Sequence, residues 1–212
     1  MLDGEGFDRW ADQYDEEVRA SETENAYPFA GYGEVLGSIF RIISEKKNAT
    51  VLDIGFGTGT LTSRLYENGC TVYGQDFSKR MVELASRKMP GAHLYYGDFT
   101  KGLVEPLCDM KYDFIVATYS LHHLSDGQKT VLLEMLQEKL NDGGQILIGD
   151  IAFGTRGELE RCRMETGEAW DDEEIYCVAD ELKRTFPALC FTKIAFCSGV
   201  LSLPADRQNA GC

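Results

Sequence analysis

The chain has 212 residues and a formal net charge of −14. This length fits a single domain with a sizeable core. No run of about 18 apolar residues occurs, so a membrane-spanning helix is not expected. The amino terminus is acidic and lacks the apolar stretch of a signal peptide, which favours a cytoplasmic location.

The negative charge lies mainly in two segments. Residues 1–25 carry a net charge of −7 and residues 154–174 carry −5, so the rest of the chain is nearly neutral. An acidic protein repels the phosphates of DNA and RNA, and a nucleic-acid partner is therefore not expected. The alternative interpretation is that both segments are solvated helix faces that keep the protein dissolved.

The sequence contains seven cysteines, an odd number, and they form neither a C-x-x-C pair nor a zinc spacing. We therefore expect reduced, mostly buried thiols in place of structural disulfides. For the same reason we predict no metal site.

The first predicted element is an amphipathic helix over residues 6–19. Aromatic and apolar residues recur there at spacings of three and four, and Tyr14 is one of them. Residues 21–29 are predicted to form a loop. A second helix is predicted over 32–44, because its apolar residues also have helical spacing.

The glycine-rich stretch over residues 50–60, TVLDIGFGTGT, is the strongest motif in the chain. A short buried strand over 51–54 leads into Gly55, Gly57 and Gly59, a turn that only small residues can follow. A helix opens directly afterwards. A strand, a glycine turn and a helix start together form a site that a nucleotide-like ligand can approach closely.

Asp76 follows a strand predicted over 71–74 and lies 21 residues after the first glycine of the turn. The second strand of such a unit presents an acid at this point to the hydroxyls of a ribose. Asp76 or Ser78 could instead cap the helix predicted over 79–88. Met81, on the first turn of that helix, is placed either against an adenine ring or in the core.

A third strand ends just before Asp98, and a fourth strand over 113–117 leads into a loop over 118–126 with His122 and His123. In an open α/β sheet the ligand lies beyond the carboxyl ends of the strands, so this loop faces the reaction centre. The two imidazoles are candidate bases with near-neutral pKa. A structural role in supporting the loop is the alternative.

The remaining predicted elements are a helix over 128–140, a tight turn over 141–144, a strand over 145–151, a helix over 171–186, and strands over 190–197 and 200–203 joined by a hairpin at Ser198-Gly199. Strands and helices alternate before that hairpin. This order predicts an α/β fold with a doubly wound, mostly parallel seven-stranded sheet and a terminal antiparallel hairpin. We expect one domain over 1–204, with a helical flap over 1–30, a lid insertion over 152–170, and a disordered tail over 205–212.

Four linked features resemble the class I S-adenosylmethionine-dependent methyltransferases. They are the glycine turn preceded by Asp53, the acid at Asp76, the sequence Gly97-Asp98-Phe99, and the loop after the fourth strand. The W-A-x-x-Y-D start and the T-Y-x-x-H-H-L-x-D loop resemble small stand-alone methyltransferases of Gram-positive bacteria. The resemblance covers roughly residues 7 to 203 and implies a Rossmann-like fold, S-adenosylmethionine as cofactor and S-adenosylhomocysteine as product.

The resemblance also implies a set of cofactor-binding residues. By this resemblance, the side chain of Asp98 would bind the adenine amino group and the next backbone N–H would bind the ring nitrogen. A Tyr in the amino-terminal segment would lie near the methionine end of the cofactor. The implied residues are Tyr14, Asp53, Gly55, Gly57, Gly59, Asp76, Phe77, Met81, Asp98, Phe99 and Thr118.

The predicted activity is methyl transfer to a small-molecule acceptor by in-line displacement, with His122 and His123 as the catalytic residues. A base is not obligatory, because a positioned nucleophile gains most of its rate from proximity and orientation. Closure of the acidic flaps would favour a cationic or neutral acceptor. We expect no membrane partner and a monomer or homodimer.

Two alternatives belong to other functional classes. A non-catalytic S-adenosylmethionine-binding sensor or partner subunit would keep the same cofactor residues. A nicotinamide-dependent oxidoreductase does not fit, because its fingerprint is G-x-G-x-x-G and this chain has G-x-G-x-G.

Overall fold

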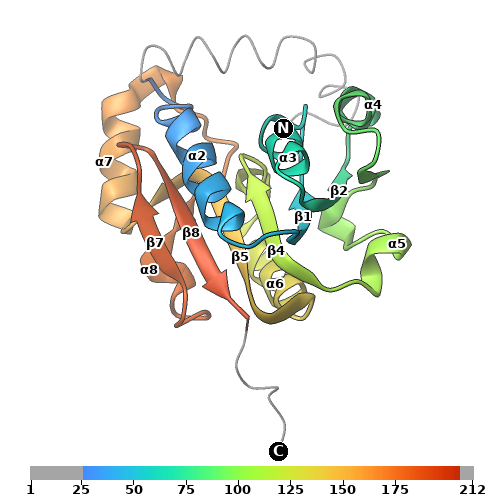
Figure 1. Cartoon of the computed structure of the whole chain (residues 1–212). Coiled ribbons are helices and arrows are strands. Elements are labelled where there is room, and N and C mark those ends of the chain that lie inside the picture. The colour runs from blue at the N-terminus through green and yellow to red at the C-terminus, as the bar shows by residue number, and fades with distance from the viewer. Residues whose placement is uncertain (1–25, 206–212) are drawn as a thin grey trace, which may run out of the picture.

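A computed structural model of the chain describes residues 26–205 (Figure 1). The predicted helix over 6–19, including Tyr14, lies outside the described residues, as does the tail from residue 206. The strands are β1 Thr50–Ile54, β2 Thr71–Asp76, β3 His93–Tyr96, β4 Tyr112–Thr118, β5 Leu140–Phe153, β6 Cys177–Val178, β7 Cys190–Lys193 and β8 Ser198–Pro204.

The sheet has the strand order β3-β2-β1-β4-β5-β8-β7, and β6 pairs with β5 off this path. β1 to β5 pair in parallel, whereas β8 runs antiparallel to both β5 and β7. The predicted doubly wound, mostly parallel sheet with a terminal antiparallel pair is therefore confirmed. The short strand β6 is an addition that the sequence did not predict.

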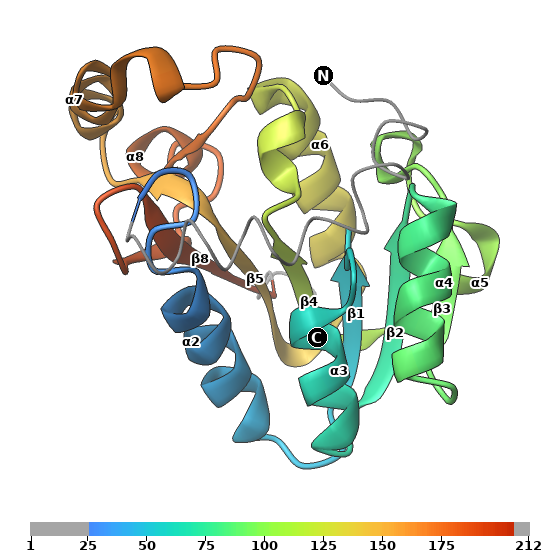
Figure 2. The same ribbon diagram turned by 90° about the horizontal axis from the view of Figure 1, so that it is seen from above.

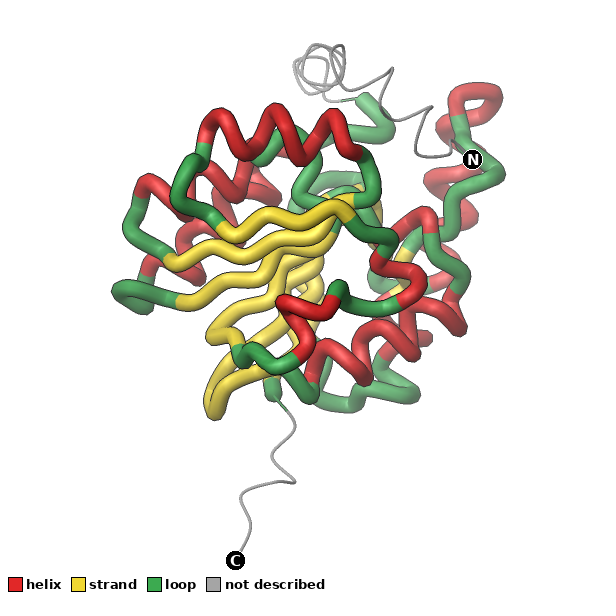
Figure 3. The backbone as a smooth tube through the Cα atoms, turned by 90° about the vertical axis from the view of Figure 1, so that its right-hand side faces the viewer, coloured by secondary structure: helices red, strands yellow, loops and turns green. Residues whose placement is uncertain are grey.

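Helices cover both faces of the sheet, as Figures 2 and 3 show. They are α2 Tyr32–Ser44, α3 Thr60–Glu67, α4 Lys79–Lys88, α5 Glu105–Cys108, α6 Asp126–Gln137, α7 Arg156–Thr166 and α8 Ala179–Leu182, with 3-10 turns η1 Phe99–Lys101, η2 Leu121–His123 and η3 Gly167–Ala169. None of these helices within residues 26–205 is both long enough and apolar enough to cross a bilayer.

Two large apolar clusters, and a third small one that includes Ala85 of α4, hold the helices to the sheet. α2 and α3 pack through residues such as Ile39 and Leu65 on one face, and α6 and α8 pack through residues such as Leu136 and Leu182 on the other. The approach of α2 to β5 is close, because a Cβ added at Gly149 would lie 2.5 Å from a methyl group of Val35. In an open α/β sheet of this kind, a ligand site is expected at the carboxyl edge of the parallel strands.

The helix predicted over 171–186 is wrong over most of its length. Residues 171–176 form an irregular segment, Cys177 and Val178 pair with Ala152 and Phe153 of β5, and only Ala179–Leu182 is helical. The backbone N–H of Ile175 donates to the carbonyl of His122 at 2.8 Å. These backbone groups bond to other parts of the chain, which removes them from a helical ladder.

The predicted hairpin at Ser198-Gly199 is also misplaced. The turn lies over residues 194–197, between the end of β7 and the start of β8 at Ser198. The N–H groups of Ile194 and Ala195 both donate to the carbonyl of Ser198. Gly199 is a strand residue whose added Cβ would lie 2.5 Å from the ring of Phe191. The glycine there permits close packing and does not make the turn.

The predicted tight turn over 141–144 is likewise part of β5. The register shifts between Tyr112, which pairs with Leu140, and Phe114, which pairs with Gln145. The extra residues of β5 are accommodated as an irregularity in the ladder.

Candidate active site

The glycine turn after β1 is built from backbone conformations that disfavour side chains. Gly55, Gly57 and Gly59 have φ values of 72°, 56° and 79°, in the left-handed region. A Cβ at Gly55 would lie 2.6 Å from the Cβ of Ser120, whereas a Cβ at Gly57 would meet nothing within 4 Å. Gly55 is therefore required by packing, and Gly57 leaves open space above the strand ends.

Asp76, at the end of β2, fixes this turn. Its Oδ2 accepts a hydrogen bond from the N–H of Gly57 at 2.8 Å, and its Oδ1 accepts one from the N–H of Ser78 at 2.9 Å. Ser78 caps α4, because its hydroxyl oxygen accepts a hydrogen bond from the N–H of Met81 at 3.1 Å. Capping of α4 thus falls to Ser78, and the Asp76 carboxylate joins the end of β2 to the glycine turn.

Asp53 lies beneath the turn and is fully buried. Its Oδ2 accepts a hydrogen bond from the hydroxyl of Thr62 at 2.6 Å. The other oxygen, Oδ1, has no hydrogen-bond partner among the described residues. Burial raises the pKa of Asp53 to about 7, and the nearby charge of Asp76 adds to this rise while the Thr62 hydrogen bond opposes it.

A cavity of about 670 Å³ opens over the carboxyl ends of the strands. This volume is within the range typical of small-molecule sites. The predicted site residues that line it are Gly55, Gly57, Asp76, Phe77, Met81, Phe99, Thr118, His122 and His123. The structure therefore brings most of the predicted cofactor residues and both histidines into one cavity.

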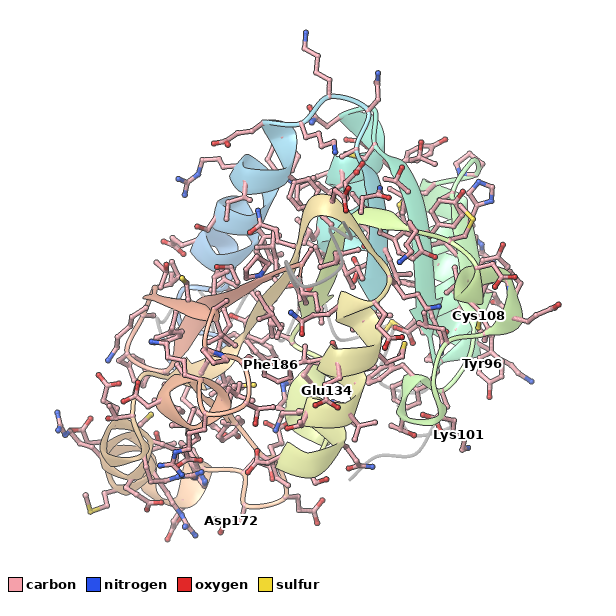
Figure 4. The ribbon with its side chains drawn as sticks, turned by 90° about the horizontal axis from the view of Figure 1, so that it is seen from below. Tyr96, Lys101, Cys108, Glu134, Asp172 and Phe186 are labelled. Atoms are coloured by element: carbon pink, nitrogen blue, oxygen red, sulfur yellow. The ribbon has the colours of Figure 1, made fainter. Side chains whose placement is uncertain are left out.

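Three predicted cofactor residues do not line this cavity. Asp53 lies beneath the turn, and Gly59 is the last glycine of the turn, directly before α3. Asp98 is engaged elsewhere, because its Oδ1 accepts hydrogen bonds from the N–H and hydroxyl of Thr100, and its Oδ2 pairs with Lys101 at 3.0 Å. These contacts outweigh partial burial and lower the pKa of Asp98. Figure 4 shows Lys101 on the β3 side, away from Asp172 beside α7.

The opposite end of the cavity is organised around His122, which lies in η2 after β4. Its Nδ1 hydrogen-bonds Oδ1 of Asp150 at 2.6 Å, and its Nε2 lies 3.5 Å from Oε1 of Glu174. Asp150, in β5, also accepts hydrogen bonds from the N–H groups of Leu121 at 3.2 Å and Ile151 at 2.8 Å. The carboxylate of Asp150 thus fixes both the ring and the backbone of η2.

Burial and charge act in opposite directions on the two imidazoles. Burial lowers the pKa of His122, but the charges of Asp150 and Glu174 overcome this and raise it. For His123, burial and the neighbouring His122 lower the pKa to about 3. Burial raises the pKa of Glu174, against the effect of His122. The two carboxylates therefore favour the charged form of His122, whereas burial and His122 favour the uncharged form of His123.

The segment 171–176 is fastened to this end by several long-range contacts. The fully buried Lys129 of α6 donates from Nζ to the carbonyl oxygens of Leu124, at 2.9 Å, and Ile175. The hydroxyl of Tyr176 donates to Oε2 of Glu174 at 2.8 Å. Figure 2 shows the chain after α7 passing beside the end of α6. These contacts position the carboxylate of Glu174 over His122.

Aromatic rings complete the wall on the α2 side. Tyr27 stacks on Trp170 with ring centroids 5.3 Å apart, and its hydroxyl hydrogen-bonds that of Tyr176. Tyr119 packs against Phe29, at 5.5 Å between ring centroids, and against Tyr32. Its φ of 50° is rare for a residue with a bulky side chain, and such conformations cluster at functional sites.

Sequence reasoning missed Asp150, Glu174 and the aromatic residues Tyr27 and Trp170. One signal was available for Asp150, which is the one acid in the otherwise apolar stretch QILIGDIAF. An acid in a central strand must find a partner when it is buried. No comparable pattern marks Glu174, because it lies in a run of four acids that has the composition of a solvated loop.

A doubly wound sheet with a glycine turn and a cavity at the carboxyl ends of its strands defines an α/β protein that binds a nucleotide-like ligand. Comparison with known proteins makes the class specific. A family described as a methyltransferase domain matches residues 51–144. An uncharacterized methyltransferase of Geobacillus thermodenitrificans (strain NG80-2) is 34% identical over 206 residues, which cover 96% of this chain and 91% of the relative. The chain belongs to this family of S-adenosylmethionine-dependent methyltransferases.

Solved structures share the fold. One is the magnesium protoporphyrin IX methyltransferase from Synechocystis PCC 6803 with bound S-adenosylhomocysteine. It matches this chain with a TM-score of 0.67 and 18% identity, over 84% of this chain and 85% of that chain. The N-methyltransferase NodS from Bradyrhizobium japonicum WM9, in complex with S-adenosylhomocysteine, has a TM-score of 0.62 and 15% identity, over 85% and 89% of the two chains.

Proposed function

We propose that this enzyme transfers a methyl group from S-adenosylmethionine to a small neutral or cationic molecule by in-line displacement. The observation that carries the proposal is that one cavity is lined both by the glycine turn with Asp76 and by His122 and Glu174, with Asp150 behind His122. A donor held at one end would then meet an acceptor held at the other. Such positioning supplies most of the rate in a displacement reaction.

The residues at the glycine turn fit the cofactor. The space above Gly57 allows close approach to the backbone, and the carboxylate of Asp76 is placed where a ribose is expected. Phe77, Met81 and Phe99 offer apolar and aromatic surface for the adenine ring. If Asp98 binds the cofactor, its carboxylate must first release its contacts with Thr100 and Lys101. When bound, S-adenosylmethionine supplies an electrophilic methyl group.

The charges around the cavity favour an acceptor that is not an anion. Its lining includes the carboxylates of Asp76, Asp171, Glu173 and Glu174, and among the described residues no Lys or Arg lines it. The faces of aromatic rings also attract cations. In the absence of a bound cation, a carboxylate or phosphate acceptor would meet repulsion here, whereas an amine or a thiol would not.

We assign His122 and His123 to the acceptor end, where they position the acceptor. His122 is held between two carboxylates, and the pKa of His123 is lowered to about 3, which makes its imidazole a weak base. His123 is therefore poorly suited to remove a proton at neutral pH. The contribution of the two imidazoles is to orient the acceptor and to shape the electrostatic field around it.

The proposal is tested by calorimetric titration with S-adenosylmethionine and S-adenosylhomocysteine, followed by an acceptor screen that detects S-adenosylhomocysteine. Asp76→Ala should weaken binding ten-fold or more, about 1.4 kcal/mol, and Asp142→Ala, at an exposed Asp far from the cavity, should not. Amine or thiol acceptors should react faster than matched carboxylates. Absence of binding to the folded protein, or equal turnover of anionic acceptors at low salt, would contradict the proposal.

A further inference from the structure

We propose that His122, His123 and Glu174 bind a divalent transition-metal ion such as Zn²⁺ at the acceptor end of the cavity. Each residue offers one ligand atom, and these three atoms all lie within 4.8 Å of one another. Sequence spacing does not predict this site, because two adjacent histidines and a glutamate about fifty positions later match no familiar ligand spacing. The inference deepens the proposed function and rests on it only for the role of the ion.

The spacing of His122 and Glu174 fits two ligands of one ion. Nε2 of His122 and Oε1 of Glu174 are 3.5 Å apart, which is beyond the normal length of a hydrogen bond. Two ligand atoms at about 2.1 Å from a tetrahedral ion are separated by about 3.4 Å. The ligand atoms of all three residues lie within 4.8 Å of one another, so we expect His123 to move closer to the other two ligands when the ion binds.

The residues around the three ligands also match a metal centre. A metal-binding histidine usually donates its second ring N–H to a carboxylate, and His122 makes this contact with Asp150 at 2.6 Å. Two backbone N–H groups hold Asp150 in turn. Glu174 is oriented by Tyr176, whose hydroxyl donates to Oε2 at 2.8 Å and leaves Oε1 facing His122.

Three protein ligands leave a coordination position open, as in catalytic metal sites. All three line the cavity, so the open position would face a bound acceptor. An acceptor thiol or hydroxyl that binds there would lose its proton to water, and the electron pair of the broken S–H or O–H bond would stay on the acceptor atom and coordinate the ion. The ion would thus generate the nucleophile at the acceptor end of the cavity.

The experiment is a titration of the full-length, reduced protein with Co²⁺, followed by competition with Zn²⁺. Co²⁺ is chosen because its visible absorption reports coordination number, and a charge-transfer band would reveal binding to one of the seven cysteines instead. We expect saturable binding without a thiolate band. Glu174→Gln and His123→Ala should each weaken it by roughly ten-fold or more. Both residues are only partly buried, so both variants should fold.

Two matched controls make the result specific. His93→Ala removes an exposed histidine of β3, and Glu173→Gln removes a carboxylate that lines the same cavity one residue away. Neither should change Co²⁺ affinity. Absence of saturable binding, a thiolate spectrum, or equal losses in the controls would overturn the metal site. Titration of the same variants with S-adenosylhomocysteine separates this outcome from failure of the proposed function, because cofactor binding should persist in all four.

Discussion

The two ends of the cavity are built in different ways. At the cofactor end, Gly55, Gly57 and Asp76 lie within 22 residues of one another, and the contacts among these elements involve mainly the backbone. At the acceptor end, side chains from distant elements contact one another directly, and the hydroxyls of Tyr27 and Tyr176 meet across 149 positions of sequence. One end is therefore a local motif, and the other is a product of the whole fold.

The largest expected effect is on the cofactor end, from Gly55→Ala. The new Cβ would lie 2.6 Å from Ser120, and φ is +72°. Overpacking and the left-handed conformation together should destabilise the fold by about 2 to 5 kcal/mol. Gly57→Ala is the matched control, since its Cβ meets open space; thermal unfolding should show a loss of only about 1 to 2 kcal/mol. Equal losses would contradict this account of the turn.

A second effect at the cofactor end concerns pH. Burial raises the pKa of Asp53 to about 7 in the folded protein, above its unfolded value, so the folded state binds the extra proton between about pH 4 and 7. Stability should therefore fall as pH rises through this window, by roughly 4 kcal/mol. Asp53→Asn should remove this part of the slope. Denaturant titrations of both proteins from pH 4 to 8 measure it, and parallel curves would contradict the prediction.

At the acceptor end, Lys129→Met should loosen the segment 171–176. The substitution leaves the carbonyl oxygens of Leu124 and Ile175 without their buried donor, a loss of about 3 kcal/mol. Hydrogen exchange of the amides in 171–176 should accelerate. Lys139→Met is a suitable control, because Lys139 lies past the opposite end of α6 and its ammonium donates to the carbonyl of Cys108. Equal acceleration of exchange in both variants would contradict the proposed role of Lys129 in holding this segment.

Asp150→Asn should change the free energy of unfolding less than Lys129→Met does, but it should clearly lower turnover. The substitution removes the negative charge that holds His122, and a hydrogen bond to a charged group contributes about 2 kcal/mol. Turnover with any acceptor found in the screen should fall at least ten-fold, while S-adenosylhomocysteine affinity should stay within about two-fold. Parallel loss of both quantities would show that the two ends are not separable.

The same difference explains what the sequence could predict. The sheet, the glycine turn and the position of Asp76 follow from short-range patterns, since hydrophobic runs and glycine spacing act over a few residues. The sequence pattern predicts a helix over 171–186, but residues 171–176 are irregular, because their partners, His122 and Lys129, are brought beside them only by the folded sheet. The pattern likewise predicts a turn at Gly199. The residue that requires a glycine there is Phe191, and its ring lies on the neighbouring strand, where a local pattern cannot reveal it.

The central claim is that one cavity holds the cofactor at one end and the acceptor at the other. Calorimetric titration with S-adenosylhomocysteine of Asp76→Asn and Glu174→Gln, compared with the unmodified protein, tests it most directly. The account predicts that Asp76→Asn weakens binding ten-fold or more, about 1.4 kcal/mol, whereas Glu174→Gln leaves it within about two-fold. Equal weakening by both variants, or an effect of Glu174→Gln alone, would contradict it.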